Sequence, residues 1–258
     1  MPVAADLYYH VYAEDTSTSR SPIVLIHGAG GNHLYWPPEV RRLPGFTVYA
    51  LDLPGHGESS GSGQQSIEAY TQSILAWMDA IELTPAVLVG HSMGGAIALT
   101  LALDAHDRVS ALALIGSGAR LRVHSDLLEN SANETTFHTA IETVAQWSFS
   151  TQAPSRLVEL ATQRMSEVRP SVLNGDFIAC DHFDETERIA GIKQPTLLIV
   201  GAEDRMTPPR FSIFLSETIP DARLETVPEA GHMVMLEKPQ AVADHLLKFL
   251  HQIENKTG

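Results

Sequence analysis

Short apolar runs rich in Val, Ile and Leu recur along the chain, and each ends at a glycine or a turn. The runs are continuous and do not alternate with polar residues, which is typical of strands buried on both faces of a parallel sheet. The predicted strands are Leu7 to Tyr12, Ile23 to Ile26, Phe46 to Leu51, Ala86 to Val89, Val109 to Ile115, Thr196 to Val200 and Arg223 to Val227.

Helical patterns lie between these runs. Between Ser66 and Leu83, apolar residues recur with a period close to 3.6, and the same holds between Pro239 and Ile253. The stretch from Ser92 to Leu103 is small and apolar on most sides, which predicts a helix buried against the sheet. Strands that alternate with helices predict an α/β fold with a mostly parallel, doubly wound sheet.

Residues 120–190 interrupt this rhythm, because they contain no good strand run. Phe137, Ile141 and Val144 follow helical spacing, as do the apolar residues between Leu157 and Met165. We therefore expect a helical cap, or lid, at 120–190, inserted into a core made of residues 1–119 and 191–258. In open α/β sheets ligands bind beyond the carboxyl ends of the strands, where such a cap would cover the site and exclude water.

Composition and charge exclude several classes of function. The 258 residues are 44% hydrophobic and 19% charged, which is typical of a globular protein with a full core. The net charge of −14 argues against nucleic acid or an anionic membrane as partner, since both require clustered Lys and Arg. No apolar stretch reaches the roughly 18 residues that span a bilayer, and no secretory signal is visible, so a cytoplasmic location is expected.

The single cysteine, Cys180, excludes an internal disulfide and agrees with a reducing compartment. His182 follows two residues later, yet a lone cysteine is more often a small buried apolar residue than a nucleophile. The 12 histidines show none of the spacings typical of a metal site. We therefore expect no metal and no cofactor.

The strongest chemical signal is Gly90-His91-Ser92-Met93-Gly94, a Gly-x-Ser-x-Gly pattern between a predicted strand and a predicted helix. Gly and Ser are common, so the pattern alone is weak, but this placement is typical of a strained turn that exposes a serine hydroxyl. The flanking glycines are required because the residues on either side of the serine crowd together. A phosphate-binding turn would need a Gly-x-Gly-x-x-Gly or a Lys, and neither is present.

Three further segments carry polar residues at predicted strand ends. The first, His27-Gly-Ala29-Gly-Gly31, follows a buried strand and could aim the Ala29 N–H at the site, where it would pair with the Met93 N–H as an oxyanion hole. The second segment is Gly201-Ala-Glu203-Asp204, in which either carboxylate could orient a histidine. The third segment is Gly231-His232. Its histidine completes the series Ser92, Asp204, His232 along the chain, with each member at the end of a predicted strand.

Together these segments resemble the α/β-hydrolase superfamily. The matching motifs are His27-Gly-Ala-Gly-Gly31, Asp52-Leu-Pro-Gly-His-Gly-Glu-Ser59, Gly90-His-Ser-Met-Gly-Gly95, Gly201-Ala-Glu-Asp204 and Gly231-His232, in family order from about residue 7 to residue 253. The resemblance implies Ser92 as nucleophile, His232 as general base, Asp204 as its orienting acid, and Ala29 with Met93 as the oxyanion hole. Serine at position 92 disfavours dehalogenases and epoxide hydrolases, which carry Asp there. The Asp52 to Ser59 loop is interpreted as structural.

Three functions are compatible with the sequence. The leading one is hydrolysis of a carboxylic ester with a small to medium, largely apolar substrate, because the cap is rich in apolar residues. Gly28, Trp36, Trp147 and Met233 are the candidate pocket residues. The second is a lactonase or a C–C bond hydrolase of carboxylate-bearing ring-cleavage products. Arg120 or Arg122 could supply the cation that binds the substrate carboxylate, although we prefer to interpret both as exposed residues of a surface loop. The third is a non-catalytic ligand receptor with the same fold. The expected partner is a small-molecule ester or lactone; the sequence specifies neither the physiological substrate nor the oligomeric state.

Overall fold

The computed structural model describes residues 2–13, 20–83 and 85–257. These residues contain a central sheet of eight strands in the order β1-β2-β4-β3-β5-β6-β7-β8. The strands are β1 (Val3–Ala4), β2 (Leu7–Ala13), β3 (Ile23–Ile26), β4 (Thr47–Leu51), β5 (Ala86–His91), β6 (Val109–Ile115), β7 (Thr196–Gly201) and β8 (Ala222–Val227).

Parallel pairing dominates the sheet. β4, β3, β5, β6, β7 and β8 are parallel neighbours, whereas β1 and β2 form an antiparallel edge against β4. Every residue of β3, β5 and β7 is buried, as expected of strands covered on both faces. The α/β class with a mostly parallel, doubly wound sheet is therefore confirmed.

Helices cover both faces of the sheet. On one face, α2 (Ile67–Ala80), α3 (Met93–Asp104) and α8 (Pro209–Thr218) pack into a core with Val24 and Leu88. On the other face, α1 (Pro38–Arg41) and α10 (Pro239–Thr257) pack into a core with Leu25 and Val89. Successive strand residues point to opposite faces, so each strand feeds both cores.

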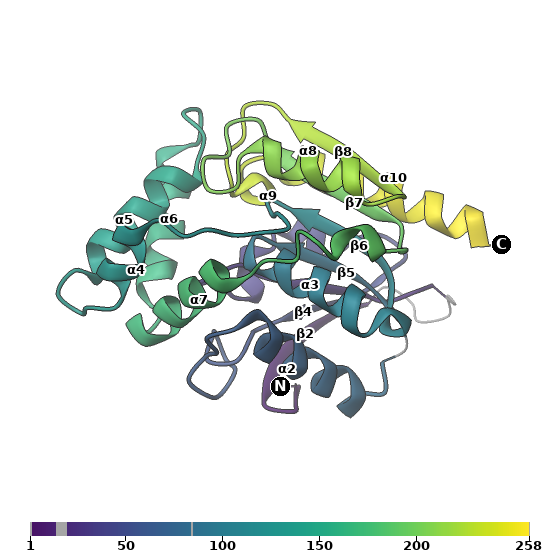
Figure 1. Cartoon of the computed structure of the whole chain (residues 1–258), viewed down its shortest axis with the longest axis horizontal. Coiled ribbons are helices and arrows are strands. Elements are labelled where there is room, and N and C mark those ends of the chain that lie inside the picture. The colour runs from purple at the N-terminus through teal and green to yellow at the C-terminus, as the bar shows by residue number, and fades with distance from the viewer. Residues whose placement is uncertain (1, 14–19, 84, 258) are drawn as a thin grey trace.

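Four helices, α4 (Ser125–Ser131), α5 (Phe137–Ser148), α6 (Ser155–Ser166) and α7 (Pro170–His182), lie between β6 and β7 in the chain. Figure 1 shows them gathered at one end of the molecule, with the C-terminal helix α10 extending from the opposite end. They share a core of their own, formed around Ile141, Leu173 and Phe177. We call α4–α7 the helical insertion.

Most predicted strands and helices agree with the structure to within one to three residues at each end. The sequence patterns did not predict β1, α4, α7 and α8. In α7 the apolar residues occur on several sides of the helix and Gly175 and Asp176 interrupt them, so the sequence shows no helical period. The remaining short helices are η1 (His33–Tyr35), η2 (His106–Arg108), η3 (Ile189–Gly191) and α9 (Val234–Glu237). Among the described residues, no helix is long and apolar enough to cross a membrane.

Candidate active site

The polar residues singled out in the sequence lie at the carboxyl ends of four parallel strands. His27 follows β3, Ser92 follows β5, Asp204 lies beyond β7 and His232 lies beyond β8. Because parallel strands all end at the same edge of the sheet, these segments meet there although they are far apart in the chain.

Ser92 occupies a strained turn between β5 and α3. Its backbone has φ 53° and ψ −116°, which an L-residue rarely adopts. The turn is so tight that a Cβ on Gly90 would lie 2.2 Å from the carbonyl oxygen of Gly94, and one on Gly94 would lie 2.1 Å from that of Ile26. The two glycines of the motif are therefore required by close backbone approach.

The two segments that carry Met93 and Ala29 both lie beside the serine. Met93 is the first residue of α3, so its N–H has no acceptor within the helix, and the helix dipole adds positive potential at this end. Across from it, a Cβ placed on Gly28 would lie 3.1 Å from Cβ of Ser92, and Ala29 lines the same cavity as Ser92. The side chain of Met93 points into the core, so only its backbone is available to the site.

Asp204 and His232 form a buried hydrogen-bonded pair. Nδ1 of His232 donates to Oδ2 of Asp204 at 2.9 Å, and Asp204 also accepts the Thr207 hydroxyl at 2.8 Å and the Thr207 N–H at 2.8 Å. Burial alone would raise the pKa of Asp204, but His232 and these donors outweigh it and hold the pKa below its usual value. An ionised Asp204 thus fixes the Nδ1–H tautomer and leaves Nε2 of His232 free to accept a proton.

His91, the last residue of β5, supports the His232 loop. Its Nε2–H donates to the carbonyl oxygen of His232 at 3.0 Å, and the two rings lie 4.7 Å apart. Burial, reinforced by His232, lowers the pKa of His91 to about 3, so the ring is neutral at physiological pH. Sequence reasoning missed this role, although a histidine inside the Gly-x-Ser-x-Gly motif was a visible signal.

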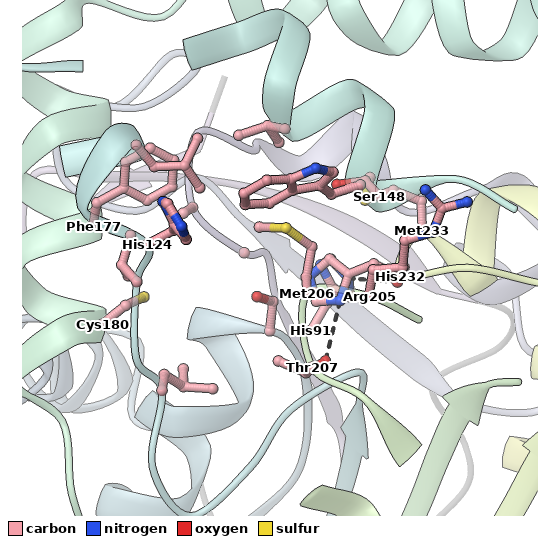
Figure 2. A pocket seen from close by; sticks show the side chains of 18 of the residues that line it. His91, His124, Ser148, Phe177, Cys180, Arg205, Met206, Thr207, His232 and Met233 are labelled. Carbon is pink, nitrogen blue, oxygen red and sulfur yellow. Dashed lines mark hydrogen bonds between the residues drawn. The ribbon is translucent and has the colours of Figure 1, made fainter. Parts of the chain in front are cut away.

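Ser92 and His232 share one cavity of about 570 Å³. Among the described residues, no hydrogen bond joins Oγ of Ser92 to the His232 ring. Such contacts are often long without substrate and tighten when it binds. Figure 2 shows Thr207 and His232 on one side of the cavity, with His124, Phe177 and Cys180 of the helical insertion and its flank on the other.

Three of the four predicted pocket residues, Gly28, Trp147 and Met233, line this cavity. Trp36 is a correction: it is fully buried in the core between the sheet and α10, and it does not line the cavity. Tyr35, the residue before Trp36 and the last of the 3₁₀ turn at His33–Tyr35, lines the cavity where Trp36 does not.

The remaining candidate residues lie in the cavity wall, in ion pairs or in hydrogen bonds. Cys180 lines the cavity wall, but burial raises the pKa of its thiol, which disfavours a thiolate nucleophile. Arg120 and Arg122 both pair with Asp184, at 3.7 and 3.6 Å, and Arg122 also lines the cavity. Glu203 accepts from Thr151 of the helical insertion. No cluster of His, Cys, Asp and Glu suited to a metal ion occurs in the parts of the chain that the structure describes.

Glu237 is a second supporting residue that the sequence did not reveal. One carboxylate oxygen accepts the Gly231 N–H at 2.8 Å, next to His232, and the other accepts the Ser150 N–H at 3.1 Å. The Met233 N–H in turn donates to the carbonyl oxygen of Ser148 at 3.0 Å. The loop that carries His232 is therefore tied to the helical insertion.

Comparison with known proteins adds family context. The family model of the alpha/beta hydrolase fold matches residues 21–239. The candidate carbamate hydrolase RutD of Azorhizobium caulinodans is 30% identical, with 97% of each chain covered. A pimeloyl-[acyl-carrier protein] methyl ester esterase of Neisseria meningitidis is 30% identical over 86% of this chain and 90% of its own.

The enol-lactonase of Burkholderia xenovorans LB400 is a solved structure with a TM-score of 0.88 and 26% identity, over 95% of this chain and 96% of its own. The dihydrolipoyllysine-residue acetyltransferase component of the acetoin cleaving system of Pseudomonas putida is 30% identical over 90% of this chain, which spans only 64% of that protein. The names of these proteins point to different substrates. Likeness to them therefore identifies the family of this chain but not its substrate.

Proposed function

The chain belongs to the α/β-hydrolase fold family, and from this premise we propose that it is a serine hydrolase of carboxylic esters with small to medium, largely apolar substrates. One observation carries the proposal. Ser92, held at positive φ, and His232, hydrogen-bonded to Asp204, line a single cavity of about 570 Å³.

The proposed mechanism is a two-step acyl transfer. Nε2 of His232 takes the proton of Oγ of Ser92 as this oxygen attacks the substrate carbonyl carbon. The N–H groups of Ala29 and Met93 bind the oxygen that becomes negative. The tetrahedral intermediate expels the alcohol, which takes the proton from His232. Water, activated by the same His232, then attacks the acyl-enzyme and releases the acid and Ser92.

We also propose that residues 120–190 act as a cap over a hydrolase core of residues 1–119 and 191–258. Supporting this division, the helical insertion has its own apolar core around Ile141 and Leu173. Its apolar side chains, among them Trp147 and Phe177, line the cavity, and Figure 2 shows Phe177 on the side away from His232. An apolar wall of this kind favours an apolar acyl or alcohol group and excludes water from the acyl-enzyme.

The first experiment combines labelling with turnover. We expect a fluorophosphonate probe to add one group to the wild-type protein and none to Ser92→Ala, as read by intact mass. A panel of p-nitrophenyl esters of rising chain length should be hydrolysed by the wild type only. Absence of both labelling and turnover in the wild type would remove the proposal and favour a ligand receptor.

A second candidate, hydrolysis of a carboxylate-bearing lactone, is favoured by Arg205. This side chain lines the cavity, and no ion pair of Arg205 is found among the described residues. Arg122, in contrast, is paired with Asp184 and donates to the carbonyl oxygen of Asp181. The likeness to the enol-lactonase structure supports the same candidate.

Arg205→Gln separates the two candidates. If a lactone carboxylate binds Arg205, the substitution should raise KM for carboxylate-bearing lactones about tenfold or more, since a hydrogen bond to a charged group contributes about 1.5–3 kcal/mol. Turnover of neutral esters should change less than about threefold on the same scale. Equal effects on both substrate classes would exclude a carboxylate site at Arg205.

A further inference from the structure

Asp176 of α7 is a fully buried carboxylate with donors from three other elements. Oδ2 accepts the Gly30 N–H at 2.8 Å and Nε2–H of His56 at 2.8 Å, and Oδ1 accepts the Tyr70 hydroxyl at 2.5 Å. Gly30 belongs to the loop after β3, His56 to the loop after β4, and Tyr70 to α2. The helical insertion therefore reaches directly into the loop that carries the proposed oxyanion donor Ala29.

The hydrogen bonds of His56 require a charged ring. Nδ1 faces the carbonyl oxygen of Pro54 at 3.1 Å and Nε2 faces Asp176, so both nitrogens face acceptors and both must carry a proton. Burial alone would lower the pKa of His56, but the Asp176 carboxylate outweighs it and raises the pKa. His56 and Asp176 thus form a buried ion pair with every polar atom satisfied.

His27, whose ring lies 4.9 Å from that of His56, is in the opposite state. Its Nε2 accepts the Leu53 N–H at 3.0 Å, so only Nδ1 carries a proton, which it donates to the carbonyl oxygen of Gly28 at 2.8 Å. Burial, together with the charge on His56, lowers the pKa of His27 to about 4. One ring of the pair is neutral and the other is charged.

These contacts fix two successive peptide groups of the loop. The Gly28 carbonyl accepts from His27 and from the Gly31 N–H at 3.0 Å, and in a trans peptide the Ala29 N–H must point to the opposite side. The next peptide is held by its Gly30 N–H on Asp176. Ala29 therefore lies between two fixed peptide planes, beside Ser92 at the cavity.

We propose that Asp176, paired with His56, is a positioning residue that holds the Ala29 N–H in place to bind the developing oxyanion. The inference rests on the proposed acyl transfer, since the oxyanion forms only in that reaction. A buried ion pair commonly adds little net stability compared with apolar packing, so positioning explains its presence better than stability does. The simpler alternative is that the pair only anchors α7 to the core.

Kinetics distinguish positioning from anchoring. Asp176→Asn keeps the shape but offers one acceptor oxygen where the carboxylate offered two, and it removes the counter-charge of His56. Because an oxyanion contact acts in the transition state, kcat should fall while KM stays within about twofold. Removing an oxyanion donor lowers kcat about 10²–10³-fold, so displacing one should lower kcat about tenfold or more, and further in Asp176→Ala.

The matched control is Asn174→Ala, two residues earlier on α7. Its amide donates to the carbonyl oxygen of Leu128 and to Oγ of Ser131, which ties α7 to α4 without reaching the loop after β3. This variant should lose thermal stability and keep kcat. All rates are expressed per active site titrated with the fluorophosphonate, so that partly unfolded protein does not lower the apparent kcat.

Hydrogen exchange gives a readout that needs no substrate. The peptide containing residues 27–31 should exchange faster in Asp176→Asn than in the wild type and be unchanged in Asn174→Ala. A kcat within about twofold of the wild type in both Asp176 variants, or unchanged exchange at 27–31, overturns the inference and leaves anchoring as the role. Failure of the proposed function is seen separately, in the wild type and in Ser92→Ala.

Discussion

The two sides of the cavity are held together in different ways. On the sheet side, directional hydrogen bonds fix the polar groups around His232: His232 to Asp204, Asp204 to Thr207, and His91 to the His232 carbonyl. On the side of the helical insertion, the wall consists of apolar contacts that involve Trp147, Phe177 and their neighbours. Directional bonds specify positions to a fraction of an ångström, whereas apolar contacts specify mainly shape and volume.

The difference separates chemistry from recognition. Substitutions on the sheet side should change the rate for every substrate, because they move groups that act on the reacting atoms. Substitutions of the apolar residues that line the insertion side should change the preference among substrates, because they alter the volume available to the acyl or alcohol group. The following four predictions test this contrast, from the largest expected effect to the smallest.

The first prediction concerns Asp204→Asn on the sheet side. The amide cannot hold the Nδ1–H tautomer of His232 as the carboxylate does, so kcat should fall about 10⁴-fold on all esters. Steady-state kinetics on p-nitrophenyl esters measure the loss. Glu203→Gln is the control: Glu203 contacts Thr151, and its substitution should change kcat less than about threefold. A larger loss in Glu203→Gln than in Asp204→Asn would transfer the acid role to Glu203.

The contrast also explains what the sequence could predict. Strand ends and the motif around Ser92 are local patterns, and parallel strands bring such ends together without further information. Trp36 and Tyr35 show the limit: both are aromatic and adjacent, and only the path of the 3₁₀ turn determines which one reaches the cavity. Asp176 was invisible because its partners Gly30 and His56 are 146 and 120 residues away in sequence.

The second prediction concerns Gly28→Ala, which adds one methyl group to the sheet side. Its Cβ would lie 2.9 Å from Nδ1 of His91 and 3.1 Å from Cβ of Ser92, so the loop must shift and carry the Ala29 N–H with it. We expect kcat to fall about 10²-fold, comparable with loss of an oxyanion donor. Gly191→Ala is the control, because a Cβ there meets nothing within 4 Å. Normal kcat in Gly28→Ala would show that the loop tolerates displacement.

The third prediction is that acid weakens the sheet side. The pKa of His91 is lowered to about 3 and that of His27 to about 4, so both stay neutral in the folded protein while they take up protons in the unfolded chain. Their stabilisation is complete above about pH 6.5 and is lost as the pH falls from there, to about pH 4 for His27 and about pH 3 for His91, by up to about 1.4 kcal/mol per pH unit for each group. His56 behaves in the opposite way. Because its pKa is raised, its stabilisation is complete below about pH 6.5 and is lost as the pH rises above that value.

Urea unfolding at pH 7 and pH 5 tests this prediction. The free energy of unfolding should be lower at pH 5, and the drop should be smaller in His91→Gln, which removes one of the two buried neutral rings. An equal drop in the wild-type protein and in His91→Gln would contradict it, since the His91 ring would then bind protons equally in the folded and unfolded states.

The smallest effect is expected on the insertion side, in Trp147→Ala. Trp147 lines the cavity and packs edge-on against His124, with ring centroids 5.6 Å apart. Its removal enlarges the cavity, so kcat/KM should shift in favour of longer acyl chains by about tenfold or less, relative to the acetate ester. Leu160→Ala, on the exposed face of α6, is the control and should leave the preference unchanged. A uniform loss over all chain lengths would show that Trp147 orients the reacting group, and the separation between the two sides of the cavity would then fail at this residue.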